Sequence, residues 1–390
     1  MDSKALSQSK VLVLGEFAGA HETLLVKYLV DRATTVAFIE TLLTRYYSPG
    51  MDILRASCYR TGHLEARFGY GGNSGLLLRP SKTRRWLLYA LTVLYLAMSL
   101  TRLRHRFDIC IACNVPFPLV GLTLRKLRLV RKVIFVSVTH FPHNMHLFRF
   151  IDKISQNACD AVWYQTKRMQ HVKEKEGWIK NKLILRILAP IGVDTRNKSP
   201  NNRVERRTMG YLGRLDKDMG LDLTIEAFLG VTDSVPDARL VIIGSGPSEK
   251  ELQEKARMLG LTDSIEYKGF IGDRKIVEGI LARWAVGIVP YVPVPGGSVY
   301  YADSSKAKEY IQAGIPIITT KVPEVALEIE QEKAGFAVEY DRDELAKAMI
   351  RLLTDDKLWQ NCRENVGQLA AKYDYREIYD GAFRASRINL

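Results

Sequence analysis

The chain has 390 residues, of which 47% are hydrophobic and 26% charged, and this composition places it among ordinary globular proteins large enough for two domains. Its net charge of +14 is uneven, because residues 1–200 carry a net charge of +18 while the remainder carries −4. We therefore expect only the first half to meet an anionic surface, either an acidic membrane or, less in keeping with its motifs, a nucleic acid.

Apolar runs in residues 1–200 predict strands that alternate with helices. A glycine loop at residues 15–20 leads from the first run into a predicted helix, His21–Val30. Such alternation is typical of a doubly wound parallel sheet. The predicted strands are Lys10–Gly15, Thr35–Glu40, Phe107–Cys113, Lys132–Thr139, Ala161–Gln165 and Leu183–Ala189.

The uncharged segment Trp86–Leu100 stands out because basic residues flank it on both sides. As a helix it would span about 22 Å, and crossing a bilayer takes ~20 residues. Two interpretations stay open, a buried helix of the first domain or a helix lying at a membrane interface. The flanks, which can touch lipid in both cases, are Arg79, Lys82, Arg84 and Arg85 before the segment and Arg102, Arg104 and Arg106 after it.

The cysteines and histidines of the first half do not predict a metal site. Cys110 and Cys113 have CxxC spacing but lie in an apolar run without a second pair, so we interpret them as buried thiols, which suits a reducing cytoplasm. Met1–Lys10 is polar, and we expect no signal peptide there. His140, His143 and His146 share one loop with no adjacent cysteine or carboxylate.

A polar, aperiodic stretch at Asp194–Arg207 predicts the linker between two domains, residues 1–200 and 201–372, followed by a helical tail at residues 373–390. The second half repeats the alternation of strands and helices, with helices expected at Leu221–Leu229 and Ser248–Leu259. Two such domains would bind a ligand in a cleft outside the carboxyl ends of their strands. The predicted strands are Thr208–Leu212, Arg239–Gly244, Ser264–Tyr267, Ala285–Pro290, Ile315–Thr319 and Phe336–Glu339.

The most informative stretch runs from Ser304 to Ile318. Ser304 and Ser305 can cap a helix whose free N–H groups and positive dipole end form an anion site. Lys306 adds a charge there, and Glu309 adds two acceptor oxygens one turn later. Phosphate donors and a diol acceptor at this spacing suit a nucleoside diphosphate, although an ordinary capped helix explains the pattern equally well.

Four ordered motifs of the second half resemble a known family. Gly213-Arg214-Leu215, Gly244-Ser245-Gly246-Pro247 and Lys268-Gly269-Phe270 each follow a strand, and Ser304–Thr319 comes near the end. Together they resemble the retaining glycosyltransferases of family 4, whose GT-B fold consists of two Rossmann-like domains. The first half resembles the family more loosely.

The resemblance implies roles for individual residues. Glu309 would bind the ribose of a donor nucleotide sugar, while Ser304, Ser305 and Lys306 would meet its diphosphate. Arg214 would pair with phosphate oxygens. His140 would lie near the transferred sugar, although a purely structural histidine explains it as well. Further residues expected around the donor are Gly19, Lys217, Gly244, Gly246, Gly269, Phe270 and Asp303.

Two positions depart from the family pattern. Tyr301 stands eight residues before Glu309, where many members carry a glutamate, and Asp303 is the nearest acid. The chain resembles a subgroup with the pattern Ser-x-Lys-x-x-Glu-Tyr, which dispenses with that glutamate. Met219 stands where the family usually has a phosphate-binding lysine, and Lys217 lies two positions earlier.

These features together predict a retaining glycosyltransferase that moves a sugar from a nucleotide-diphosphate donor to a hydroxyl or phosphate of a lipid-linked or glycolipid acceptor. We expect it to act at the cytoplasmic face of a membrane without a metal, because Arg214, Lys306 and the helix dipole can neutralise a diphosphate. Two alternatives stay open. One is a non-catalytic GT-B partner protein, suggested by Tyr301 and Met219, and the other is a nucleotide-sugar epimerase, which the basic first half disfavours.

Overall fold

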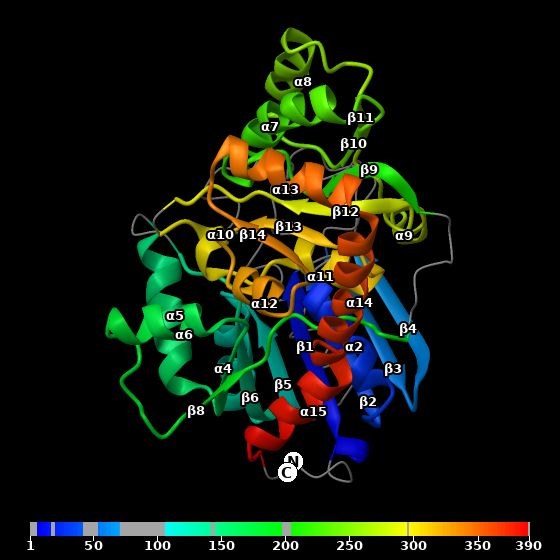
Figure 1. The fold of residues 1–390 in the computed structure, drawn as a ribbon. Coiled ribbons are helices and arrows are strands. Elements are labelled where there is room, and N and C mark those ends of the chain that lie inside the picture. The colour runs from blue at the N-terminus through cyan, green and yellow to red at the C-terminus, as the bar shows by residue number, and fades with distance from the viewer. Residues whose placement is uncertain are drawn as a thin grey trace. The chain divides into compact units, whose positions relative to one another are not determined.

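The computed structural model describes residues 6–16, 20–41, 54–70, 106–141, 145–196, 204–294 and 296–388. The chain divides into two compact units, Met1–Pro190 with Tyr375–Leu390, and Ile191–Asp374. Each unit is built on one sheet with helices packed against it (Figure 1). The expected α/β class with two doubly wound units is confirmed, and the twelve predicted strands are all found within three residues of their expected ends.

The division between the units falls at Pro190–Ile191 rather than at residue 200, and the returning tail begins at Tyr375 rather than at residue 373. Hydrogen bonds explain the earlier division. The amide of Ile191 donates to Asp303 Oδ2 at 2.7 Å, and the amide of Val193 donates to the carbonyl of Tyr373 at 2.7 Å. Residues 191–194 therefore belong to the second unit, although they precede most of the predicted linker Asp194–Arg207.

The sheet of the first unit has eight strands in the order β4-β3-β2-β1-β5-β6-β7-β8. The strands are β1 Lys10–Glu16, β2 Thr35–Thr41, β3 Leu54–Arg60, β4 His63–Tyr70, β5 Phe107–Cys113, β6 Val130–Ser137, β7 Ala161–Tyr164 and β8 Leu185–Leu188. The described helices are α2 Ala20–Val30, α4 Phe117–Lys126, α5 His146–Ala158, α6 Lys167–Lys175 and α15 Tyr375–Ala385.

One edge of this sheet differs from the wholly parallel sheet that we expected. Strands β3 and β4 form a hairpin, and β3 pairs with β2 in antiparallel orientation. Thr61 and Gly62 form its two-residue turn with φ values of 44° and 85°. Both being positive is typical of a tight hairpin turn. Strand β4 alternates polar and apolar residues, so it lacks the continuous apolar run that marks most of the other strands.

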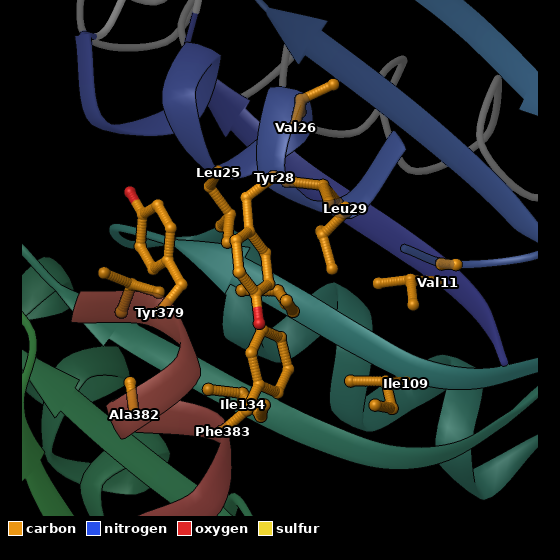
Figure 2. Packing of buried hydrophobic residues seen from close by; sticks show 14 of the residues in the cluster. Val11, Leu25, Val26, Tyr28, Leu29, Ile109, Ile134, Tyr379, Ala382 and Phe383 are labelled. Carbon is orange, nitrogen blue, oxygen red and sulfur yellow. The ribbon is translucent and has the colours of Figure 1, made fainter. Parts of the chain in front are cut away.

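The C-terminal helix α15 packs on the core of the first unit, as Figure 2 shows for Tyr379 and Phe383. Tyr28 of α2 stacks on Phe383 with ring centroids 5.8 Å apart, and its hydroxyl donates to Asp380 Oδ1 at 2.5 Å. Trp163 of β7 donates through its indole nitrogen to Ser386 Oγ at 2.9 Å. These buried aromatic contacts hold the tail on a unit that lies far from it in sequence.

The sheet of the second unit has six parallel strands in the order β11-β10-β9-β12-β13-β14. They are β9 Glu205–Leu212, β10 Arg239–Ile243, β11 Ile265–Gly269, β12 Trp284–Val289, β13 Ile317–Thr320 and β14 Gly335–Val338. The helices are α7 Leu221–Ser234, α8 Glu249–Met258, α9 Arg274–Leu281, α10 Ser298–Tyr301, α11 Ser305–Ala313, α12 Val325–Gln331, α13 Arg342–Thr354 and α14 Asp356–Lys372, with a short 3-10 turn at Lys217–Met219.

All five cysteines are buried free thiols, which confirms the interpretation of Cys110 and Cys113. Among the described helices, none combines the length and the apolar character that crossing a membrane requires. The segment Trp86–Leu100, for which two interpretations were open, lies outside the described residues.

Candidate functional site

Helix α11 is formed and capped as its sequence predicts. Ser304 Oγ accepts a hydrogen bond from the amide of Ala307 at 3.3 Å, and the helix ends at Gly314. Tyr310 fixes the helix against the sheet, because its hydroxyl accepts from the amide of Leu212 at 2.8 Å. Gly287 in β12 leaves room for that ring, since a Cβ there would lie 2.5 Å from it. The start of α11 is thereby held by contacts to two central strands.

The amine of Lys306 lies inside a buried aromatic cage. The residue is only 7% exposed, and Nζ lies 4.8 Å and 4.7 Å from the ring centroids of Tyr211 and Tyr291. It donates to Met219 Sδ at 3.0 Å. The pKa of Lys306 is lowered to about 7, mainly by burial and secondly by the nearby charge of Arg214. At neutral pH a large share of these amines is therefore uncharged, and an incoming anion would favour the ammonium form.

Arg214 and Lys306, predicted as a pair, are brought together by the structure. The end of the Lys306 side chain packs against Gly213, the residue before Arg214, where an added Cβ would lie 2.4 Å from Lys306 Cε. A side chain at 213 would displace the end of Lys306 from its cage, and the φ of 142° also favours glycine there. Arg214 itself forms ion pairs with Asp216 and, at 3.9 Å, with Asp218.

Asp216 and Asp218 have Asp-x-Asp spacing, a pattern that can bind a divalent cation and that the sequence interpretation overlooked. Here both carboxylates face the guanidinium of Arg214. Within the part of the chain that the structure describes, no three His, Cys, Asp or Glu side chains cluster as a metal site would require. Independence from metal stays a prediction, which a chelator tests.

The departure at Met219 has a structural counterpart. Met219 is buried beside Lys306, so a lysine at 219 would bring a second ammonium group into the same cage, where like charges repel. The amine of Lys306 from α11 thus lies beside the side chain of position 219. Lys217 takes no part in this cluster, because its side chain is 85% exposed and lies 3.7 Å from Glu251 of α8.

Glu309 lies one turn after Lys306 on α11, and its carboxylate is held by Arg274. The two guanidinium N–H groups of Arg274 donate to Glu309 Oε1 at 2.6 Å and Oε2 at 2.5 Å. Arg274 is the first residue of α9, and its Nε donates to Glu278 Oε1 at 3.1 Å. The sequence interpretation missed Arg274. An available signal was its place in the first helical turn, where the macrodipole disfavours a cation.

The predicted glycines shape the loops beside this site. A Cβ on Gly244, which has φ 139°, would lie 1.8 Å from the carbonyl oxygen of Gly213, and one on Gly246 would lie 2.4 Å from that of Leu215. These glycines therefore let two strand-end loops pack closely. Gly269 accepts through its carbonyl from the amide of Gly244 at 2.8 Å, and the neighbouring Phe270 is 64% exposed. Contact of these loops with a nucleotide stays a prediction.

Asp303, expected near the donor, is engaged elsewhere. Its carboxylate accepts from the amide of Ile191 and pairs with Lys308 Nζ at 3.5 Å, both side chains being buried. Burial raises the pKa of Asp303 and lowers that of Lys308. Lys308 also lies over the ring of Tyr373, 3.0 Å from its centroid. These contacts tie the first and last residues of the second unit to α11, and the sequence interpretation did not anticipate them.

His140 belongs to the first unit, and its contacts there are structural. Its Nε2 lies 3.3 Å from Glu176 Oε1, and its ring stacks on Trp178 at a centroid distance of 5.6 Å. Burial is the main reason why the pKa of His140 is lowered, and the negative charge of Glu176 acts in the opposite direction. Contact with a sugar stays a prediction. Gly19 and His143 lie outside the described residues.

Comparisons with known proteins bear on the family and the fold. Residues 193–368 match the family model "Glycosyl transferases group 1". A GDP-mannose-dependent alpha-(1-6)-phosphatidylinositol dimannoside mannosyltransferase of Mycobacterium tuberculosis is 34% identical over 114 residues, 27% of this chain and 29% of that protein. Alpha-D-kanosaminyltransferase of Streptomyces kanamyceticus is 28% identical over 171 residues, 43% of this chain and 42% of that protein. The matched segments thus span less than half of either relative.

The fold of the whole chain also has solved counterparts. The structure of HepE from Anabaena in complex with UDP superposes with a TM-score of 0.67 over 96% of this chain and 98% of that one, at 16% identity. At such identity the likeness shows the fold alone. Residues 193–368 therefore match the group 1 glycosyltransferase family, and the whole chain has the two-domain fold of HepE.

Proposed function

We propose that the protein is a retaining glycosyltransferase that moves a sugar from a nucleotide-diphosphate donor to a hydroxyl or phosphate of a glycolipid acceptor. The observation that carries this proposal is the meeting of Arg214 and Lys306 beside Gly213, with Glu309 one turn along the same helix. This arrangement offers two cations and a helix N-terminus to a diphosphate, and a carboxylate to a ribose.

The chemistry explains why these groups suffice. When the sugar–phosphate bond breaks, negative charge grows on the leaving diphosphate and positive charge on the sugar carbon. Fixed positive groups stabilise that transition state without having to reorganise. Lys306 is held in its cage before the donor arrives, and Arg214 lies within range of its charge. We infer that no divalent cation is needed to neutralise the leaving group.

The acceptor class is inferred from charge and from the relatives. The first half carries a net charge of +18, which favours an anionic surface. One relative is named for transfer to a phosphatidylinositol mannoside, which is a glycolipid. Both observations support an enzyme that works as a peripheral protein on a membrane, and we propose the cytoplasmic face.

The decisive experiment is transfer from a panel of nucleotide sugars to a membrane lipid extract by purified protein. Donors are first ranked by the rise in melting temperature that each produces. A labelled lipid product, or slow donor hydrolysis without acceptor, supports the proposal. Donor binding with neither reaction supports the alternative of a non-catalytic GT-B partner, and interconversion of the donor sugar supports an epimerase.

Glu309→Gln tests the ribose assignment. The substitution keeps the size of the side chain but removes a charged acceptor for two hydroxyls. Hydrogen bonds to charged groups contribute about 1.5–3 kcal/mol, so donor affinity should fall roughly ten- to hundredfold. Calorimetry with the nucleoside diphosphate measures this, and unchanged affinity would reject the assignment.

The membrane assignment is tested by replacing Arg79, Lys82, Arg84 and Arg85 with glutamine. Each basic residue near an acidic leaflet contributes about 1 kcal/mol, and salt screens the attraction. The variant should therefore detach from acidic liposomes, while the native chain sediments with them at low salt and not at high salt.

Nucleotide binding by the variant is the internal control, because Arg214, Lys306 and Glu309, which are assigned to the nucleoside diphosphate, belong to the other compact unit. Equal sedimentation of the native chain with acidic and neutral liposomes, or with neither, would contradict the membrane assignment.

A further inference from the structure

We propose that Arg274 is a positioning residue that sets the carboxylate of Glu309 for the two ribose hydroxyls of the donor, with Glu278 holding Arg274 in place. This inference rests on the proposed function, because it assumes that Glu309 meets a ribose. It goes further by naming the residues that make this carboxylate selective for a ribonucleotide.

The contacts leave the guanidinium little freedom. Its two terminal nitrogens bind both oxygens of Glu309, and its Nε binds Glu278, four residues later on the same helix. Arg274 therefore bridges α9 and α11 as a planar fork between two carboxylates. A planar fork fixes the plane of the carboxylate as well as its distance, which a lysine ammonium does not.

Counting acceptor sites shows what remains for a ligand. An ionised carboxylate has about four lone-pair directions, and a bidentate arginine occupies two of them. Two are left, matching the two donors of a ribose 2′,3′-diol. The Glu309 side chain is 12% exposed, so it keeps a small open edge. Arg274 is 51% exposed and reaches Glu309 from α9.

Helix energetics do not account for the position of Arg274. Asp273 caps α9 by accepting from the amide of Lys275 at 2.8 Å, and Arg274 follows directly at the positive end of the helix dipole. A cation is disfavoured there. The carboxylates of Glu309 and Glu278 are what stabilise it, so the residue is explained by its contact with α11.

The experiment compares a ribonucleotide with its 2′-deoxy analogue. The probes are UDP and 2′-deoxy-UDP, with GDP and 2′-deoxy-GDP in parallel, and the pair whose ribonucleotide binds the native chain more tightly is used. We expect the native chain to prefer the ribonucleotide about tenfold or more, since a charged acceptor is left unpaired by the analogue. In R274M this preference should fall to about twofold, while affinity for the 2′-deoxy analogue stays nearly constant.

Matched variants separate positioning from general stability. R274K keeps the charge but loses the fork, and R274K and E278Q should both give an intermediate preference. R257M removes a similar Arg–Glu fork on α8, where Arg257 donates to Glu254 at 3.0 Å and 2.6 Å, and it should leave the preference unchanged. Should R274M fail to fold, R274K carries the test.

An unchanged preference in R274M and R274K, or an equal loss of affinity for both nucleotides, would overturn the positioning role. The proposed function fails separately: it fails if the native chain binds no nucleoside diphosphate. A native chain that binds UDP or GDP with a preference for ribose, and keeps that preference without Arg274, refutes this inference alone.

Discussion

Replacing Lys306 with methionine is expected to stabilise the empty protein while lowering its affinity for a nucleoside diphosphate ten- to hundredfold or more. Lys306 is buried, and its pKa is lowered from 10.5 to about 7. Each unit of pKa difference corresponds to about 1.4 kcal/mol, so burying the charged amine costs a few kcal/mol at neutral pH or below. Methionine removes that cost and fits an apolar cage, but it removes a phosphate partner too.

The pH dependence follows from the direction of the shift. Between pH 7 and 10.5 the unfolded chain binds more protons at this lysine than the native chain, so this residue makes native stability rise with pH across that window. Urea unfolding at pH 6 and pH 9 should show the rise in the native chain and a smaller one in Lys306→Met. The free energy of unfolding of the variant should exceed that of the native chain most at pH 6.

Ligand binding should draw a proton onto the same amine. At pH 8 most Lys306 side chains are neutral, and a diphosphate would favour the ammonium form. Calorimetry in buffers of different ionisation enthalpy should show proton uptake by the native chain and little by Lys306→Met. The control is Lys217→Met, which replaces an exposed lysine of the adjoining turn and should show the same proton uptake as the native chain. Equal proton uptake with and without Lys306 would contradict its assignment to the diphosphate.

Arg214→Ala is expected to reduce turnover about 10²–10³-fold, a loss larger than its effect on donor binding. A positioned group that neutralises charge developing in the transition state contributes about this much. The ratio of the loss in kcat to the change in donor Kd separates transition-state stabilisation from uniform binding. Steady-state kinetics with the best donor of the panel, together with calorimetry, measures both.

The same assay tests the inferred independence from metal. Arg214 occupies the carboxylates of Asp216 and Asp218, so a cation would have to compete with the guanidinium for them. We expect full activity in excess chelator, and a strict requirement for added metal would contradict this mechanism. For the comparison with Arg214→Ala, the control is Lys217→Ala, which removes a nearby positive charge that lies outside the cage.

Much of the second unit was predictable from local signals. Its central strand Trp284–Val289 is buried on both faces and reads as an apolar run, and a serine cap and a glycine mark the ends of α11. The grouping of Arg214 with Lys306 was also anticipated, because the motifs that carry them resemble those of a known family. The hairpin Leu54–Tyr70 was missed because its strands alternate apolar and polar residues, as His63–Tyr70 does, and therefore contain no continuous apolar run.

The sequence alone determined those features of this protein that neighbouring residues encode. They are two α/β halves, a capped helix carrying Lys306 and Glu309, and an uneven distribution of charge. Tertiary structure decided which charges meet. Lys306 lies in a cage of aromatic rings beside Met219. Arg274 of α9 binds the carboxylate of Glu309 on α11. Asp303 pairs with Lys308 and accepts a hydrogen bond from the amide of Ile191. Such pairings join residues distant along the chain, and the free energy of a buried charge depends on the partners and the solvent exclusion that only the folded chain provides.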